Sequence, residues 1–534
     1  MKRKLLTALL CGALMLTSLA GCGQGAGNQS GTSAGGESAV KDELVFVNYR
    51  DIRDLNPHLY AGEMYAQSIL YDTLVSNTSE GYVGCLAEDW TISEDGRTYT
   101  FNIRDGVTFS DGTPCDANAI LANFNAILEN RERHTWLEMM NLLVGVSAPD
   151  DDTFVIEMSE PYYPMLTELA CIRPFAMISP NCMIDGSTKD GVNGYIGTGP
   201  YVLTDFVTDE YAVFERNENY WGEKPAIRKI TVKVIPDNQT RIMALENGEI
   251  DLIFGKNMLD ADAISQYVDS DKFTVGLSDP TSTRHIVLNT THDILGDKSV
   301  RQALQHATNR QAISEGIFYG LEPAADTLYS TTVPYCDVDL EPYAYDADEA
   351  ARLLDEAGWT MGSDGVRAKD GQKLALDLLY NSDSVTEKTI SEYLQSEYLK
   401  LGISLNIHGE EEQSYRDNMK AGNFDMVFNI CWGMPYDPQS SLAAMRAPVY
   451  GDYAAQQGLE DKAEIDQAIT DILTSTDETK RQELYTFVLT RLHEDAVYIP
   501  LTFETNKALY TSDLKGVHFG TDQYDVDFAS MYFE

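Results

Sequence analysis

The chain has 534 residues, of which 43% are hydrophobic and 23% charged, and its formal net charge is −45. This length is too great for one ordinary core, so a globular chain of this kind is expected to form two or three domains. The acidic balance excludes a nucleic-acid partner, because no basic stripe is available for phosphates, and it disfavours adhesion of the folded body to an anionic membrane.

The N-terminal segment predicts export and anchoring. A basic start precedes an apolar run at residues 5–19, which is too short to cross a membrane, so residues 1–21 are expected to be a signal peptide. The ending Leu19-Ala20-Gly21-Cys22 resembles the bacterial lipobox, in which the cysteine is lipidated. Residues 22–40 are rich in Gly and Ser and predict a flexible tether. We therefore expect a body anchored through Cys22 at the outer face of the cytoplasmic membrane.

Strand and helix patterns alternate along the rest of the chain. Strands are predicted at residues 44–48, 98–103, 107–109, 154–158, 201–206, 212–216, 230–235, 250–254, 285–289, 374–380, 403–407, 425–430 and 497–503. Helices are predicted at residues 64–74, 117–128, 237–247, 346–358, 385–401, 415–420, 461–474 and 477–493.

Two local patterns say how these elements connect. Asp105-Gly106 predicts a hairpin between the strands at 98–103 and 107–109. The strand–helix–strand order over residues 230–254 predicts a parallel crossover. Because the alternation starts again at residue 285, the sequence predicts α/β lobes with a boundary near residue 283.

Motifs for catalysis or metal binding are absent from the sequence. The one Gly-x-Ser-x-Gly match lies in the tether, where no strand-to-helix turn can form, and no two of the eight histidines stand at helical metal spacing. No Cys-x-x-Cys pair exists, so a structural zinc site is not expected. The cysteines after Cys22 could form disulfides outside the cell, in pairings that the sequence leaves open: Cys85, Cys115, Cys171, Cys182, Cys336 and Cys431. An exported enzyme is therefore weakly supported.

Binding signals are stronger. Residues 131–136 place Arg131 and Arg133 beside Trp136, and residues 171–175 contain a further arginine. Arginine suits carboxylates because it can donate two parallel hydrogen bonds. The loop after the strand at 425–430 is rich in large flat side chains and predicts one wall of a ligand site.

Several motifs resemble the extracytoplasmic solute-binding proteins of ABC importers, in the dipeptide, oligopeptide and nickel branch. They are Arg-Asn-Glu-Asn-Tyr-Trp-Gly-Glu-Lys-Pro at 216–225, Arg-Gln-Ala-Leu at 301–304 and Ala-Arg-Leu-Leu-Asp-Glu-Ala-Gly-Trp at 351–359. The match is closer to the nickel-binding members at 55–60, 131–136, 162–164, 173–175, 432–438 and 455–459. The resemblance covers essentially the whole mature chain.

The resemblance implies a pocket in which arginines hold the carboxylates of a small organic chelator and aromatic residues pack on the metal complex. Carried over by matching motif, the ligand-binding residues are Tyr60, Met64, Arg133, Trp136, Arg173, Trp432, Tyr436 and Tyr450. In the nickel-binding members a histidine follows the Met-Arg-x-Pro run, and here Tyr450 stands at that position. Imidazole suits nickel and a neutral phenol does not. The resemblance therefore implies either a metal fully wrapped by its chelator or a different ligand.

The implied fold is α/β, with two lobes joined by two crossing strands and an extra subdomain in the first lobe. Lobe one would comprise residues 41–282, with the subdomain at about 76–194 and a return at 503–534, and lobe two would comprise residues 283–502. The implied function is capture of chelated nickel(II), with histidine as a possible chelator, and delivery to a permease driven by an ATPase. A monomer without a cofactor is expected, and the alternative is a receptor for dipeptides or short peptides.

Overall fold

The structure is a computed structural model that describes residues 41–534, apart from residues 79–80, 256–257, 432–437 and 521–525. The predicted signal peptide and tether, Cys22, Trp432 and Tyr436 therefore lie outside the described residues. Among the described helices, none combines the length and the apolar character needed to cross a bilayer.

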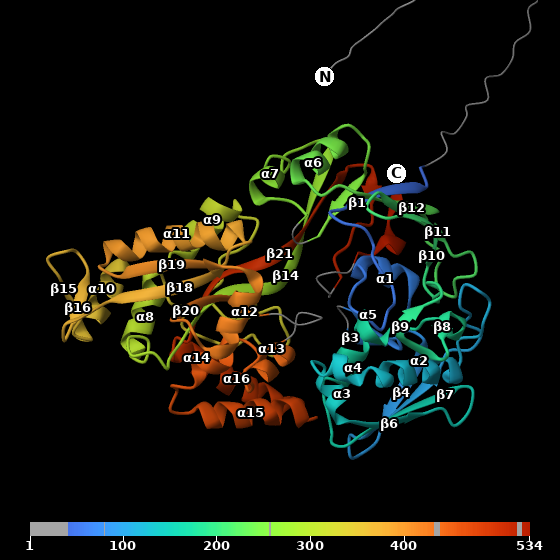
Figure 1. Ribbon diagram of the computed structural model, residues 1–534, viewed down its shortest axis with the longest axis horizontal. Helices are drawn as coiled ribbons and strands as arrows, with labels where there is room; N and C mark the ends of the chain where they lie inside the picture. The colour runs from blue at the N-terminus through green and yellow to red at the C-terminus, as the bar shows by residue number, and fades with distance from the viewer. Residues whose placement is uncertain (1–40, 79–80, 256–257, 432–437, 521–525) are drawn as a thin grey trace, which may run out of the picture. The chain divides into compact units, whose positions relative to one another are not determined.

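A ten-stranded sheet runs through the described chain (Figure 1). Five strands from the first half of the chain lie on one side, three strands from the second half lie on the other, and two long strands run between them. The order is β10 (Tyr201–Val207), β11 (Tyr211–Arg216), β12 (Lys229–Val234), β1 (Glu43–Asn48), β13 (Leu252–Phe254), β21 (Tyr498–Thr511), β14 (Phe273–Leu288), β20 (Met426–Cys431), β18 (Ala375–Asn381) and β19 (Ser404–Glu410).

The two central strands are longer than the sequence predicts. β14 and β21 pair antiparallel along nearly their whole length, but the register shifts at three points between Leu277 and His285. The predicted strands at 285–289 and 497–503 cover only one apolar end of each. Pro280 and the polar residues around it interrupt the apolar pattern in β14, and the polar residues 504–507 interrupt it in β21. Thr283 is the register partner of Phe503, so the two predicted lobe boundaries face each other across this pair. The division into lobes at those residues remains a prediction.

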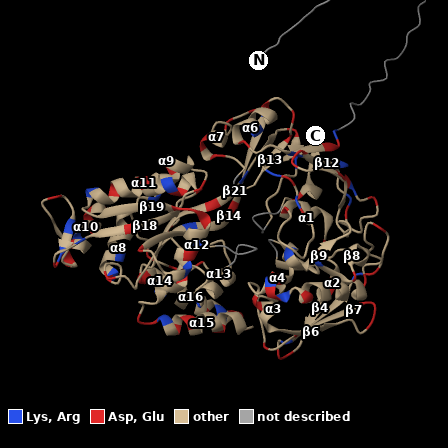
Figure 2. Ribbon diagram, in the orientation of Figure 1, with Lys and Arg blue, Asp and Glu red and all other residues tan. Residues whose placement is uncertain are grey.

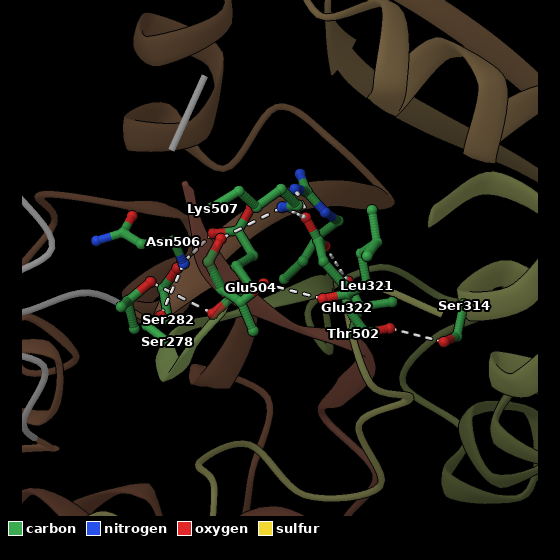
Figure 3. A network of polar contacts seen from close by, with 12 residues as sticks. Ser278, Ser282, Ser314, Leu321, Glu322, Thr502, Glu504, Asn506 and Lys507 are labelled. Carbon is green, nitrogen blue, oxygen red and sulfur yellow. Dashed lines mark hydrogen bonds and ion pairs between the residues drawn. The ribbon is translucent and has the colours of Figure 1, made fainter. Parts of the chain in front are cut away.

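A buried network of charged residues lies where the register of β14 and β21 is irregular. Arg284 on β14 pairs with Glu504 on β21, and Lys507 donates a 3.1 Å hydrogen bond to Glu322. Figure 3 shows Glu322, Glu504 and Lys507 pointing toward one another, with Thr502 donating to Glu322 at 3.0 Å. The four charged side chains are 3 to 13% exposed. The junction of the two halves of the sheet is therefore held by ion pairs that are largely excluded from water.

The predicted parallel crossover is confirmed. β12 and β13 both pair parallel with β1, and α6 (Asn238–Glu246) connects them. In the second half of the sheet, β18 pairs parallel with β19 and with β20, so the carboxyl ends of these three strands meet at one edge. Helices fill the connections, as the alternating pattern predicts. The mixed α/β class is thus confirmed.

The predicted hairpin at residues 98–109 is wrong. β5 (Thr98–Ile103) pairs with β4 (Ala87–Ile92) and β7 (Thr153–Met158), and no strand follows the turn at Gly106 among the described residues. The chain after that turn makes one isolated bridge, between Thr108 and Pro114. The preceding strand β4 and the more distant strand β7 therefore take the two edges of β5, and neither is left for residues 107–109. With β6 (Leu143–Ser147), these strands form a separate four-stranded sheet.

The α-helices cover the strands and define the connections. They are α1 (Met64–Leu70), α2 (Ala117–Glu129), α3 (Glu138–Leu142), α4 (Met165–Leu169), α5 (Ile172–Phe175), α6, α7 (Ala261–Ser265), α8 (Lys298–Ala307), α9 (Arg310–Phe318), α10 (Ala347–Glu356), α11 (Val385–Lys400), α12 (Glu412–Ala421), α13 (Pro438–Ala444), α14 (Gly451–Gln456), α15 (Lys462–Thr474) and α16 (Glu478–Glu494). The buried apolar residues divide in the same way as the sheet. One set of clusters is drawn almost wholly from residues 44–264 and 508–533, and the other from residues 286–501.

Candidate functional site

A cavity of about 1090 Å³ joins residues from two distant stretches of the chain. We call residues 60–173 of its lining the first wall and residues 381–450 the second wall. The first wall consists of Tyr60, Arg133, Trp136 and Arg173. The second wall consists of Asn381, Glu387, Glu412, Gln413, Tyr415, Arg416, Asp417, Met419, Lys420, Phe428, Asn429, Ile430, Val449 and Tyr450. The volume is in the upper range for small-molecule sites.

Arg131 and Arg133 are two residues apart in the sequence, but their side chains have different surroundings. Both lie on the short 3-10 helix η1 (Arg131–His134), which follows α2. Arg131 points into the protein and donates to the carbonyls of Met140 at 2.6 Å and Leu143 at 2.8 Å. Arg133 lines the cavity, and its guanidinium makes no hydrogen bond or ion pair with any residue that the structure describes. Arg131 therefore stabilises the fold, whereas Arg133 is free to bind an anion.

Two aromatic rings of the first wall, Tyr60 and Trp136, are linked by hydrogen bonds to each other and to the buried ring of His134. Trp136 is 44% exposed, and its Nε1–H donates to the Tyr60 hydroxyl at 2.8 Å. That hydroxyl also shares a 2.7 Å hydrogen bond with Nδ1 of His134. Burial raises the pKa of Tyr60 to about 12, while burial and the adjacent Arg133 lower the pKa of His134 to about 4. Tyr60 and His134 are both uncharged near neutral pH, so this part of the wall offers flat neutral surfaces to a ligand.

Arg173 lines both this cavity and a smaller one beside it. Its Nη1 donates to the carbonyls of Tyr60 and Gly62, both at 3.1 Å, which holds the guanidinium 5.7 Å from the Tyr60 ring. Arg173 and Tyr60 also line the adjacent cavity of about 400 Å³, and Met64 lines that one. Met64 thus lies next to the first wall, where its side chain is largely buried.

The second wall is built at the carboxyl edge of the parallel strands. Asn381 ends β18, Glu387 lies in the first turn of α11, and Glu412 begins α12 directly after β19. The Asn381 side chain donates to Glu412 at 2.5 Å, and Arg416 pairs with the same carboxylate. Ligand sites in α/β folds form where the carboxyl ends of strands meet. That rule could have identified these residues from the predicted strands at 374–380 and 403–407.

Tyr450 lies in the second wall, immediately before α14. Burial raises the pKa of its phenol, so the hydroxyl is neutral near pH 7. Nearby, Asn429 on β20 donates to Asp452 at 2.8 Å. Tyr450 therefore contributes a neutral side chain to the lining of this cavity.

The described residues include no group of three or more His, Cys, Asp or Glu side chains that could hold a metal ion. The six cysteines of the described chain are buried, and no disulfide joins any two of them. A metal that entered this cavity would need other ligands for most of its coordination positions, and a chelator would supply them.

The structure brings together most of the residues that the sequence analysis selected. Tyr60, Arg133, Trp136, Arg173 and Tyr450 line one cavity, and Met64 lines its neighbour. Trp432 and Tyr436 lie outside the described residues, so their position relative to the cavity stays a prediction. Glu387, Glu412 and Arg416 were missed, because motif matching selected only the first wall and one loop of the second.

Residues 81–452 match the family described as bacterial extracellular solute-binding proteins, family 5. The chain belongs to this family. The nickel-binding periplasmic protein of Escherichia coli K12 is 41% identical over 499 residues, which are 92% of this chain and 95% of that protein. The dipeptide-binding protein of the same organism is 26% identical over 506 residues, or 89% of this chain and 91% of its own length.

A solved structure extends the match to the fold. The crystal structure of NikA from Brucella suis in complex with Fe(III)-EDTA is 43% identical and superposes with a TM-score of 0.89, covering 92% of this chain and all of that one. The predicted two-lobed fold of the family 5 solute-binding proteins is thereby confirmed.

Proposed function

We propose that this family 5 protein is the lipid-anchored extracytoplasmic receptor of an ABC importer for a chelated transition metal, nickel(II) above all. The ligand enters the cavity as a complex with a small carboxylate chelator such as histidine. The protein then delivers the complex to a permease driven by an ATPase, and no covalent chemistry is involved. Cys22 is the proposed lipid anchor, and the receptor acts as a monomer.

The free guanidinium of Arg133 is the observation that carries this proposal. It lies in the same wall as Arg173, beside Trp136 and Tyr60, and it has no protein anion to bind in the described chain. Guanidinium groups bind carboxylates with two parallel hydrogen bonds. Because no described group of side chains could hold a bare metal ion, the wall suits the outside of a metal complex.

The relatives support a metal complex as the ligand. The Escherichia coli relative is named for nickel, and the Brucella suis structure contains Fe(III)-EDTA, a metal enclosed by a polycarboxylate. Both align over 92% of this chain. We extend the ligand class of these proteins to this chain, with nickel–histidine as the first complex to be tested.

Calorimetry on the mature protein tests the proposal with three ligands: nickel alone, nickel with histidine, and a mixture of dipeptides. We expect heat and a thermal shift from nickel–histidine and neither from nickel alone. Binding of dipeptides without binding of nickel–histidine would reject the metal proposal. Mass spectrometry and metal analysis of the ligand that co-purifies with the protein would identify the complex itself.

A receptor for dipeptides is the second candidate, and one observation favours it. Glu387 in the second wall could meet the free amine of a peptide while an arginine holds its carboxylate. The dipeptide-binding relative aligns over 89% of this chain, although its identity is lower. The same titrations separate the two candidates.

A further inference from the structure

A carboxylate in the second wall has no cation within ion-pair distance among the described residues. Glu387 lines the cavity, and its Oε2 accepts one hydrogen bond, from the backbone N–H of Asn381 at 2.9 Å. The positive charge that acts on it is Arg284, whose guanidinium already binds Glu504. One oxygen of Glu387 is therefore available to a ligand.

Glu387 is not needed to cap its own helix. Ser384 is the N-cap of α11 and accepts the N–H of Glu387 at 3.2 Å. In a capping box the glutamate would accept the N–H of that serine. Here the Ser384 N–H donates to the Asn381 carbonyl at 2.9 Å instead. The usual structural role for a glutamate at this position is thus unfilled.

The other carboxylates of the wall are already occupied. Glu412 accepts from Asn381 and pairs with Arg416. Asp417 accepts a 3.0 Å hydrogen bond from Gln413 and is exposed, so water solvates its charge. A carboxylate kept from water without a cation costs free energy, and burial accordingly raises the pKa of Glu387. A positive charge in the cavity would offset that cost.

We propose that Glu387 receives the positively charged part of the ligand while Arg133 holds a carboxylate, so that the receptor selects ligands carrying both charges. Two kinds of ligand share this chemistry: a metal complex whose cationic centre is open on one side, and a small molecule with a protonated amine. A fully wrapped chelate offers no positive charge to Glu387, so the arginines of the first wall would hold it without help from this carboxylate. The inference rests on the proposed function only in taking this cavity as the ligand site.

The test compares the wild-type protein with E387Q, E387D and E392Q by calorimetry. Glu392 lies on the same helix, its side chain is 58% exposed, and E392Q removes the same charge outside the cavity lining. The ligands are nickel–histidine, Fe(III)-EDTA, a dipeptide with a free amine and the same dipeptide acetylated at its amine. Thermal melts establish that each variant is folded.

We expect E387Q to weaken the ligand with an accessible positive charge by about tenfold or more, since one buried charge pair is lost. E387D should recover part of that loss, E392Q should match wild type, and E387Q should bind Fe(III)-EDTA at least as tightly as wild type does. If the wild-type protein binds the dipeptide but not nickel–histidine, the metal proposal fails. The role of Glu387 is then tested by the acetylated dipeptide, which should bind more weakly than the dipeptide with a free amine. Two results would overturn the inference. One is that E387Q and E392Q bind the ligands with equal affinity. The other is that the wild-type protein binds only Fe(III)-EDTA and the acetylated dipeptide, which carry no free positive charge, or binds none of the four ligands.

Discussion

The contrast between Arg131 and Arg133 gives a matched pair of variants. R133A should weaken binding of the chelate by about 10- to 100-fold, because charge-assisted hydrogen bonds are lost. It should leave the melting temperature nearly unchanged, because the Arg133 guanidinium makes no hydrogen bond or ion pair with a described residue. R131A should lower the free energy of unfolding by about 1–3 kcal/mol through the loss of hydrogen bonds to backbone carbonyls. Calorimetry and thermal melts measure both effects. A stable R133A with full affinity would remove the carboxylate clamp from consideration.

Tyr450 offers a gain-of-function experiment at one position. Its phenol is neutral and lies in the second wall, where the nickel-binding members carry an imidazole. Y450H should therefore bind a nickel–histidine complex that leaves one coordination position open more tightly than wild type does, because the imidazole can fill that position, whereas the control Y450F should not gain affinity. Identical titrations for Y450H and Y450F would mean that this side chain does not reach the metal.

Among the helices, α3 and α4 are joined by one buried carboxylate. Glu168 on α4 accepts the N–H groups of Glu138 and Met139 at the start of α3, and also the Tyr162 hydroxyl at 2.5 Å. Burial nevertheless raises the pKa of Glu168 from 4.5 to about 8. The folded state then holds a proton that the unfolded state releases between these values. The protonated Glu168 carboxyl therefore contributes fully to the stability of the folded state below pH 4.5, and this contribution is lost as the pH rises through about 8.

Glu168 therefore predicts the direction of a pH effect. From pH 5 to pH 8.5, the wild-type protein should lose roughly 2–4 kcal/mol more stability than E168Q, at about 1.4 kcal/mol for each pKa unit. Denaturant unfolding at several pH values measures this difference, with the exposed E132Q as a control for charge alone. Parallel pH profiles for wild type and E168Q would show that the carboxyl stays ionised in the folded protein.

In the charged network on β14 and β21, substitutions at Arg284 and Glu504 should have non-additive effects on the free energy of unfolding. E504A removes the main partner of Arg284 and leaves it 3.8 Å from Glu322, so unfolding should become easier by about 3 kcal/mol. R284M/E504M replaces both charges by apolar groups and should cost less than the two single changes together. Chemical denaturation of the full cycle gives the coupling energy. Additive losses would mean that Arg284 and Glu504 do not depend on each other.

Local patterns determined how much of these elements could be predicted. The helices predicted at 237–247 and 385–401 match α6 and α11 to within about one residue, because Asp237 caps α6 and Gly248 and Gly402 follow the two helix ends. The hairpin predicted at Gly106 does not form because β5 pairs with the preceding strand β4 and with β7, about 50 residues further along the chain, and the local turn signal reports neither partner. The polar middle of β14 was missed for a related reason. Residues 277–280 are partly exposed, and Thr281, Ser282 and Thr283 are buried beside β21 and the charged network, so no apolar alternation marks this part of the strand.

At the level of the molecule, the site was half predictable. Motif matching selected Arg133 and Trp136, and both line one wall of the cavity. Residue type alone could not have separated Arg133 from Arg131, because both arginines lie on the short helix η1 and differ in where their side chains point. The second wall depends on parallel strands ending at one edge, so Glu387 becomes visible only once the order of β18, β19 and β20 is known. The distribution of acidic residues does not point to Glu387, because Asp and Glu are spread over both halves of the sheet (Figure 2).

The same excess of negative charge leads to a prediction about attachment. A chain with a net charge of −45 is repelled by anionic lipids, so membrane association has to come from the N-terminal segment. In cells, the wild-type protein should partition with membranes and incorporate labelled fatty acid, while Cys22→Ala should do neither. Fragment 41–534 should not bind vesicles of anionic lipid at physiological salt. Membrane association of Cys22→Ala without label would reject the lipid anchor and point to an uncleaved signal segment as the attachment.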